Sequence, residues 1–132
     1  MNVIRIAAAL LLRADNQTLL VRKRGTRAFM QPGGKIDPGE TAEAALVREL
    51  REELGISIDP AALEPLGDAD ADAANEPGCR VAATLFALRW DGPVMPAAEI
   101  EEARWVDPAS PGALELAPLT RGHVLPLAGG MR

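Results

Sequence analysis

The sequence predicts an α/β domain in which strands and helices follow one another along the chain. Apolar runs of strand length lie at residues 2–13 and 80–90, and a helix with a leucine stripe lies between them at residues 42–54. The 132 residues are 48% hydrophobic, which is enough to bury a core. We therefore expect a single domain over residues 1–132, because no linker or internal repeat interrupts it.

The composition restricts the compartment and the partners. Cys79 is the only cysteine, so no disulfide forms within the chain and a reducing, cytoplasmic compartment is expected. The apolar run that ends at Arg13 is not followed by a cleavage site, and no run reaches the length that spans a bilayer. We expect neither a signal peptide nor a membrane partner.

Charge is distributed unevenly along the chain. The net charge is −5, yet residues 1–35 carry seven basic residues and one acidic residue, while the remainder carries seven basic and eighteen acidic residues. An acidic protein is a poor candidate for binding a nucleic-acid polymer. A local basic cluster next to an acidic helix instead suits a complex of a metal with a polyphosphate.

The first two strands are expected at residues 2–13 and 18–24, joined into a hairpin by turn residues. Alternation along the second strand places Arg22 and Arg24 on one side and Lys23 on the other. One interpretation is that Arg22, Arg24 or Arg27 reaches a substrate phosphate. The alternative is that these residues form a charged, solvated strand edge.

The segment before the helix contains an aromatic residue and several turn residues. Phe29 either lines a pocket or fills the core, and we favour the core. Gly33 and Gly34 permit an unusual turn and a close approach of the main chain to a ligand. The run from Asp37 to Gly39 is typical of a tight turn.

A helix is predicted at residues 42–54, with Thr41 as its N-cap and Gly55 just past its end. Its core-facing stripe recurs every four residues and consists of Leu46, Leu50 and Leu54. The other face carries Glu49, Glu52 and Glu53, whose like charges repel at these spacings. They form either a solvated acidic face or a set of oxygen ligands for a hard divalent cation.

These residues carry a resemblance to a known family. Gly34, then Glu40 after five residues, then the run from Arg48 to Ile56 after seven more, resemble the Nudix box at every fixed position. The preceding Pro32-Gly33-Gly34 is also similar to the segment that leads into that box. The chain therefore resembles a small, MutT-like Nudix hydrolase.

The resemblance implies a fold, a reaction and a division of roles. The fold would be an α/β/α sandwich with a mixed central sheet, and the reaction would be hydrolysis of a diphosphate bond with Mg²⁺ or Mn²⁺. Glu52 and Glu53 would bind the metal, the Gly33 carbonyl would be a further ligand, and Glu49 would be a third ligand or the base. Structural roles within the motif would belong to Gly34, Gly39, Glu40, Arg48 and Gly55, with Glu40 and Arg48 forming a pair.

The second half of the chain is expected to add strands and a last helix. A short strand is predicted at residues 63–66, followed by a solvated, mobile acidic stretch containing Asp68, Asp70 and Asp72. Residues 80–90 are apolar on both faces, which is typical of a central strand. A terminal helix is predicted within residues 114–127; it would start near Pro118 and bury Leu119, Val124, Leu125 and Leu127.

Two further candidates come from the acidic segment ahead of Trp105 and from the last helix. By resemblance, Glu99 is our first choice and Glu102 our second for a glutamate that returns to the metal site as a ligand or base. The alternative is an acidic surface loop. His123 is the only histidine and is either a surface residue or a contact to a nucleobase.

The expected partner is a small-molecule nucleotide. The chain length favours a (deoxy)nucleoside triphosphate pyrophosphatase of MutT-like type. The enzymatic alternatives are ADP-ribose, a dinucleoside polyphosphate or a nucleotide sugar as substrate, and a different class is a non-catalytic nucleotide sensor. The sequence leaves the oligomeric state open, a homodimer included.

Overall fold

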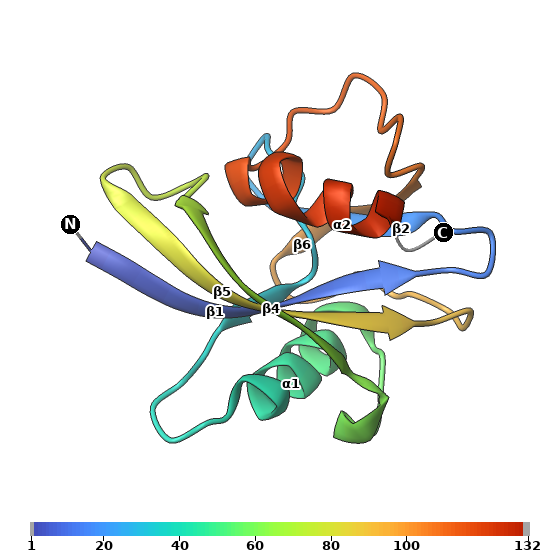
Figure 1. The fold of residues 1–132 in the computed structure, drawn as a ribbon, viewed down its shortest axis with the longest axis horizontal. Coiled ribbons are helices and arrows are strands. Elements are labelled where there is room, and N and C mark those ends of the chain that lie inside the picture. The colour runs from blue at the N-terminus through green and yellow to red at the C-terminus, as the bar shows by residue number, and fades with distance from the viewer. Residues whose placement is uncertain (1, 131–132) are drawn as a thin grey trace.

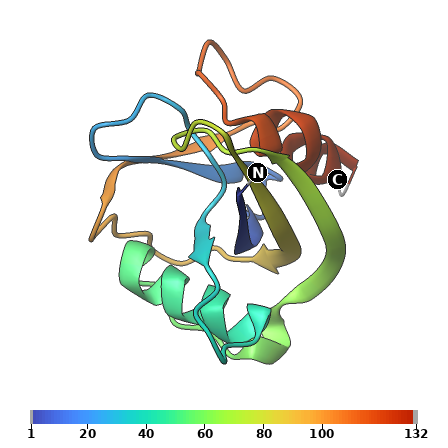
Figure 2. The ribbon, with the colours of Figure 1, turned by 90° about the vertical axis from the view of Figure 1, so that its left-hand side faces the viewer.

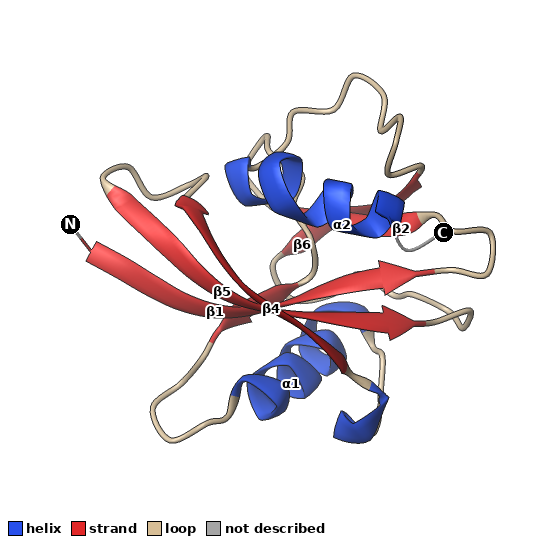
Figure 3. Ribbon diagram, viewed as in Figure 1, coloured by secondary structure: helices blue, strands red, loops and turns tan. Residues whose placement is uncertain are grey.

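The structure of the protein is a computed structural model that describes residues 2–130. A group of strands precedes each of the two α-helices, and Figures 1 and 3 show these elements. In chain order the elements are β1 (Asn2–Leu12), β2 (Thr18–Lys23), β3 (Gly33–Lys35), α1 (Ala42–Leu54), the 3₁₀ turn η1 (Pro60–Ala62), β4 (Glu64–Asp72), β5 (Cys79–Arg89), β6 (Ile100–Val106), the π-helical turn η2 (Thr120–Val124) and α2 (Leu125–Gly130).

The strands form one mixed sheet in the order β4-β5-β1-β2-β6, with β3 pairing beside β1. β5 runs parallel to β1 over its whole length, from Asn2 opposite Cys79 to Leu12 opposite Arg89. The other pairs are antiparallel, including the predicted hairpin of β1 with β2. β5 lies between β4 and β1, so it is the central strand that its apolar faces predicted.

Helices cover both faces of the sheet, and Figure 1 shows α1 and α2 on opposite sides of it. Alternate residues of β1 explain the two layers, because successive side chains of a strand point to opposite faces. One core contains Ala7, Ala9 and Leu11 together with the leucine stripe of α1. The other contains Ala8, Leu10 and Leu12 together with Leu119, Val124 and Ala128. The α/β/α sandwich is therefore confirmed.

The ends of α1 are capped as predicted. The Thr41 hydroxyl accepts a hydrogen bond from the Ala44 N–H at 3.0 Å. Gly55 adopts the left-handed conformation with φ of 67°, and its N–H donates to the Arg51 carbonyl at 3.1 Å. These caps fix where the helix begins and ends, and Figure 2 shows that β3 lies next to it.

The acidic stretch is exposed, as predicted, but it is a regular strand and not the mobile segment expected. Residues 64–72 form β4, which pairs antiparallel with β5. Asp70 and Asp72 lie on one face of it and bind the Arg80 guanidinium at 3.1 and 2.9 Å. Ala69 and Ala71, at the alternate positions, pack on the core. The alternation of aspartate and alanine was a strand pattern with period two.

The terminal helix begins at Pro118, where it was predicted, but its exposed face differs. Leu119, Val124 and Leu125 are buried as expected, whereas Leu127 is 38% exposed and the prediction for it was wrong. The wider π-helical turn η2 precedes α2 and changes the angular position of the residues that follow, so that Ala128 faces the core instead. None of the helices within residues 2–130 has both the length and the apolar character needed to cross a membrane.

Candidate functional site

The acidic face of α1 borders a cleft of about 630 Å³. Glu53 is 5% exposed, and Glu49, one turn earlier on the helix, is half-buried. Basic residues face them from the end of β2 and from β3. The cleft is lined by Lys23, Arg24, Thr26, Gly34, Lys35, Asp37, Glu49, Glu53, Asn75, Glu76, Ala98 and Glu99.

Two glycines on β3 allow this strand to lie close to β1 on one side and to a side chain of α1 on the other. Gly33 has φ of 142°, and a Cβ there would lie 2.1 Å from the Ala7 carbonyl oxygen. A Cβ on Gly34 would lie 2.5 Å from the carboxyl carbon of Glu49 and within 2.8 Å of both its oxygens. Gly34 therefore provides the space that the Glu49 carboxylate occupies.

Arg48 connects the loop before α1 to the acidic face of the helix. Its Nε and Nη2 donate to the two carboxylate oxygens of Glu40 at 2.9 and 2.8 Å, and its Nη1 donates to Glu49 at 2.9 Å. Glu40 also accepts from the Asp37 N–H at 2.8 Å. The hydrogen bonds from Arg48 lower the pKa of Glu40 to about 2. The pair expected between Glu40 and Arg48 is thus present, and it also orients Glu49.

Burial makes the two inner carboxylates harder to ionise. It raises the pKa of Glu53 to about 7, and the nearby negative charge of Glu49 adds to the rise. The Lys23 ammonium and a hydrogen bond from the Gly33 backbone oppose that rise. Burial also raises the pKa of Glu49, against the stabilising hydrogen bond and charge of Arg48. A cation bound in the cleft would therefore stabilise the ionised forms of both carboxylates.

The segment before β6 is attached to the C-terminal end of α1. The Met95 and Ala97 N–H groups donate to the Leu54 and Glu53 carbonyls at 3.0 and 2.8 Å, which satisfies two carbonyls that a helix end leaves free. Ala98 then adopts φ of 54°, and the Arg24 N–H donates to the Glu99 carbonyl at 2.8 Å. Glu99 consequently lies at the cleft, with its side chain 74% exposed and 3.7 Å from the Lys23 ammonium.

Several predicted site residues lie elsewhere or are bound to other groups. Glu52 does not line the cleft; its side chain is 52% exposed and lies 3.5 Å from Arg48. Arg22 donates to the Thr26 carbonyl at 2.9 Å and pairs with Glu102 at 3.4 Å. Those contacts hold Arg22 and Glu102 together across β2 and β6, so neither lines the cleft.

The remaining candidates divide between the cleft and the outer surface. Of the three arginines expected to reach a phosphate, Arg24 lines the cleft. Arg27 and His123 are exposed and lie outside it. Phe29 is buried in the core beneath Leu20 and Leu125, as favoured from the sequence.

Sequence reasoning missed Lys23 and Lys35 as cleft residues. The signal for Lys23 was present, because Leu19 and Val21 lie on the face of β2 that packs with α1, and Lys23 has the same alternation. Glu49 and Glu53 belong to α1, the helix that packs on this face. Lys35 is the last residue of β3, and no local pattern indicated that β3 pairs with β1.

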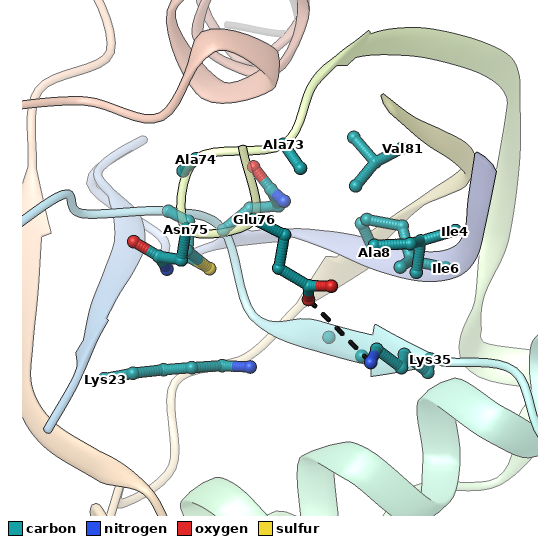
Figure 4. Close-up of a pocket in the computed structure, with 14 residues that line it drawn as sticks. Ile4, Ile6, Ala8, Lys23, Lys35, Ala73, Ala74, Asn75, Glu76 and Val81 are labelled. Atoms are coloured by element: carbon teal, nitrogen blue, oxygen red, sulfur yellow. Dashed lines mark ion pairs between the residues drawn. The ribbon is translucent and has the colours of Figure 1, made fainter. Parts of the chain in front are cut away.

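A smaller cavity of about 110 Å³ adjoins the cleft. Figure 4 shows Ile4, Ile6 and Ala8 of β1 on one side of it and the turn from Ala73 to Glu76 on another. The ion pair between Lys35 and Glu76, at 3.8 Å, lies where the cavity and the cleft meet. The two spaces share Lys23, Gly34, Lys35, Asn75 and Glu76.

The donor groups at the cleft suit a hard divalent cation. Glu49, Glu53 and Glu99 offer carboxylate oxygens, which are the ligands that Mg²⁺ and Mn²⁺ prefer. The absence of a side chain at Gly34 leaves the Glu49 carboxylate its place at the helix surface. As the side chains stand within residues 2–130, no group of three or more His, Cys, Asp or Glu residues is placed to hold a metal ion.

Comparison with known proteins identifies the family. A family model described as the NUDIX domain matches residues 3–128. The chain belongs to the NUDIX family. The match extends well beyond the box between Gly34 and Ile56 that carried the resemblance, and it includes all six strands and most of α2.

Relatives with curated names align with part of this NUDIX chain. The 8-oxo-dGTP diphosphatase of Escherichia coli is 42% identical over 62 residues, which cover 43% of this chain and 47% of that protein. An RNA pyrophosphohydrolase of Serratia proteamaculans is 49% identical over 43 residues, covering 33% of this chain and 25% of that protein. The chain thus spans less than half the length of these relatives.

Solved structures resemble the fold over nearly the whole chain. A MutT NUDIX hydrolase from Burkholderia pseudomallei superposes with a TM-score of 0.74 at 23% identity and covers 98% of both chains. A MutT protein from Methanosarcina mazei superposes with a TM-score of 0.78 at 22% identity, covering 98% of this chain and 95% of the other. At this identity the likeness establishes the fold.

Proposed function

We propose that the protein is a metal-dependent hydrolase that cleaves a diphosphate bond in a nucleoside diphosphate linked to another moiety, with (deoxy)nucleoside triphosphates as its main substrates. The observation that carries the proposal is the cleft itself. It brings Glu49 and Glu53 of α1 opposite Lys23, Arg24 and Lys35. Facing acidic and basic walls fit a cation and a polyphosphate bound side by side.

Membership of the NUDIX family supports the reaction class, and the names of the relatives support the substrate class. Two of the relatives, from Escherichia coli and Haemophilus influenzae, are named 8-oxo-dGTP diphosphatases. The cavity beside the cleft supports the same assignment, because its apolar wall from β1 offers a surface for a planar base. The phosphates would then lie in the cleft.

Mg²⁺ or Mn²⁺ would be held by Glu53 and Glu49, which line the cleft, with Glu99 and the Gly33 carbonyl as further ligands. Glu52 would join them by turning its side chain away from Arg48. When bound, such an ion neutralises phosphate oxygens and acidifies water. The side chains of the chain itself supply the rest. Glu49 or Glu99 accepts the proton of the attacking water. The two differ in their contacts, because Arg48 holds the Glu49 carboxylate in place, whereas the Glu99 side chain is exposed.

The basic residues orient the substrate. Lys23 and Lys35 extend into the cleft from β2 and β3, and Arg24 follows Lys23 at the end of its strand. Their charges would bind the phosphate oxygens and stabilise the charge that the leaving group develops when the attacking oxygen approaches in line. Glu53 is 5% exposed, so its carboxylate is shielded from bulk water. The substrate phosphates would bind beside it.

The test measures phosphate and pyrophosphate release from a panel of nucleotides with Mg²⁺, with Mn²⁺ and with EDTA. The panel contains 8-oxo-dGTP, the ordinary dNTPs, ADP-ribose, a dinucleoside polyphosphate and a nucleotide sugar. We expect metal-dependent turnover of triphosphates that Glu53→Gln abolishes, with Glu43→Gln, an exposed change on the first turn of α1, as the control. Tight nucleotide binding without turnover of any member would instead identify a sensor.

A further inference from the structure

One buried polar side chain faces the cavity with an unused donor. Four polar or charged side chains are buried in the part of the chain that the structure describes: Thr18, Gln31, Glu53 and Thr120. Thr18 donates its hydroxyl to the Leu11 carbonyl, and Glu53 belongs to the cleft. Gln31 is 6% exposed, lines the cavity of about 110 Å³, and plays no part in the cleft chemistry.

The contact between Gln31 and Thr120 fixes the orientation of the amide. The Thr120 hydroxyl donates to the Gln31 Oε1 at 2.7 Å, and Thr120 is fully buried. A hydroxyl has one hydrogen, and Oε1 is its only acceptor among the described residues. Turning the amide over would leave that buried hydrogen without an acceptor, which native interiors avoid. Oε1 therefore faces Thr120, and Nε2 faces away from it.

The amide nitrogen of Gln31 consequently reaches the cavity. It makes no hydrogen bond within residues 2–130, yet no buried side-chain nitrogen or oxygen in that range lacks a partner. An unpaired Nε2 that is not among the buried unpaired atoms must be exposed to open space. Because Gln31 lines the cavity, that space is the cavity. The cavity thus holds two N–H donors on a side chain that a neighbour holds in place.

The backbone on both sides of Gln31 is also fixed. Met30 exchanges two hydrogen bonds with Val21, at 2.7 and 2.8 Å, and the Pro32 carbonyl accepts from the Ala9 N–H at 2.9 Å. Since both neighbours are tied to the sheet, the side chain cannot withdraw by a movement of the loop. A donor fixed in this way discriminates between ligands, because a wrong group leaves it unpaired and buried.

The remaining walls define what the donor meets. Ile4, Ile6, Ala8 and Val81 are apolar and can pack against the faces of a planar ring, as Figure 4 shows for the side of the cavity formed by β1. The volume suits one ring system, and the charged part of a ligand would lie in the adjoining cleft. An N–H donor in the wall of the cavity requires an acceptor on the edge of that ring.

We propose that Gln31 is the specificity-determining residue of the site, and that its amide donates to the keto oxygen of a 6-keto purine. Thr120 is the positioning residue that holds the amide. This inference rests on the proposed function. A 6-amino purine presents N–H donors at the same place, so both it and Gln31 would lose their hydrogen bonds. Nucleotides of guanine and hypoxanthine are therefore preferred over those of adenine.

The test compares two substrates that differ at position 6, dITP and dATP, by kcat/KM. We expect the native protein to prefer dITP by about tenfold or more, as one good base contact provides. Gln31→Met keeps the length of the side chain and removes the donors, so the ratio of kcat/KM for dITP to that for dATP should fall towards one, through a higher KM for dITP. A Gln31→Met protein that retains the native preference overturns the inference.

Thr120→Val tests the positioning role. It should reduce the preference for dITP without loss of turnover, and Thr18→Val is the matched control, since it removes a buried hydroxyl far from the cavity. An equal effect of both valine variants on the substrate ratio would overturn the role of Thr120. Thr18→Val should lower the midpoint of thermal unfolding and leave the ratio as it is.

A binding measurement separates this inference from the proposed function. Calorimetry in EDTA, with IMP and AMP as probes, reports base recognition without turnover. Tighter binding of IMP that Gln31→Met abolishes supports the inference even for a protein that hydrolyses nothing. Equal binding of IMP and AMP, together with metal-dependent turnover of triphosphates, overturns the inference and leaves the proposed function standing.

Discussion

The two walls of the cleft differ in how firmly their charged groups are held. On the α1 side, Glu53 is buried, and Glu49 is fixed by Arg48 and by the space at Gly34. On the opposite side, Glu99 and Lys35 are exposed, and their ion pairs with Lys23 and Glu76 measure 3.7 and 3.8 Å. The first wall is preorganised, whereas the second can adjust to what enters.

The difference follows from what each wall is made of. A helix that packs a leucine stripe into the core holds its neighbouring carboxylates at a constant position. Exposed ion pairs contribute little to stability, because water and salt screen them. The charged groups that are in place before the ligand arrives therefore lie on the buried α1 wall. Substitutions on the two walls should therefore have effects of different size.

The largest expected difference is in turnover. Glu53→Gln should lower kcat by about 10²–10⁴-fold, because it removes a proposed ligand of the metal ion, whose stabilisation of the transition state is worth several kcal/mol. Glu99→Gln should lower it by about tenfold or less, since an exposed side chain can be replaced by water in part of its role. Steady-state kinetics with a triphosphate and Mg²⁺ check both values. Equal losses for the two variants would contradict the distinction between the walls.

A smaller loss is expected from filling the space at Gly34. A Cβ there would lie within 2.8 Å of the Glu49 carboxylate oxygens, so Gly34→Ala must displace the end of that side chain. The fold should persist, because the displaced atoms are the far end of a flexible side chain, and kcat should fall by about tenfold to a hundredfold.

Gly122→Ala is the matched control, since a Cβ at Gly122 would meet nothing within 4 Å. Both proteins should show native circular dichroism, and the control should keep its turnover. Full activity of Gly34→Ala would show that Glu49 need not occupy its observed place.

The pair of Glu40 with Arg48 gives a pH dependence of stability. The folded state lowers the pKa of Glu40 from an ordinary value of 4.5 to about 2, so the carboxylate stabilises the fold fully above pH 4.5. That contribution disappears as the pH falls through about 2. Glu40→Gln should lower the unfolding midpoint at pH 6, and its difference from the native protein should shrink between pH 4.5 and pH 2.

Thermal unfolding followed by circular dichroism at pH 6, 4 and 2.5 measures this difference. For Glu43→Gln, on the exposed first turn of α1, the difference in unfolding midpoint from the native protein should not shrink in this way as the pH falls. A difference in unfolding midpoint between Glu40→Gln and the native protein that stays constant from pH 6 to pH 2.5 would mean that the pair of Glu40 with Arg48 does not form in solution.

The smallest effect is expected on the adjustable wall. Lys35→Gln removes the exposed pair with Glu76, and the free energy of unfolding should change by about 0.5 kcal/mol or less. Activity should respond more than stability, because Lys35 lines the cleft where phosphates are proposed to bind. Urea unfolding and the KM for a triphosphate measure the two effects. A large loss of stability would place Lys35 in the preorganised wall.

Local patterns in the sequence determined the elements that depend on neighbours in the chain. The spacing from Gly34 to Ile56 indicated the family. The caps at Thr41 and Gly55 and the leucine stripe indicated the helix, and they lie where expected. These features follow from interactions within one or two turns, so residue type and spacing suffice to predict them. The hairpin and the central strand β5 were predictable for the same reason.

Tertiary structure decided what depends on residues far apart in sequence. Gln31 meets Thr120 across 89 positions, and β3 pairs with β1 beside the cleft, although no local pattern indicated either contact. Asp70 and Asp72 pair with Arg80 because β4 lies antiparallel to β5. Such contacts depend on sheet register and on how helices cover its faces, and these are set by the packing of the whole core.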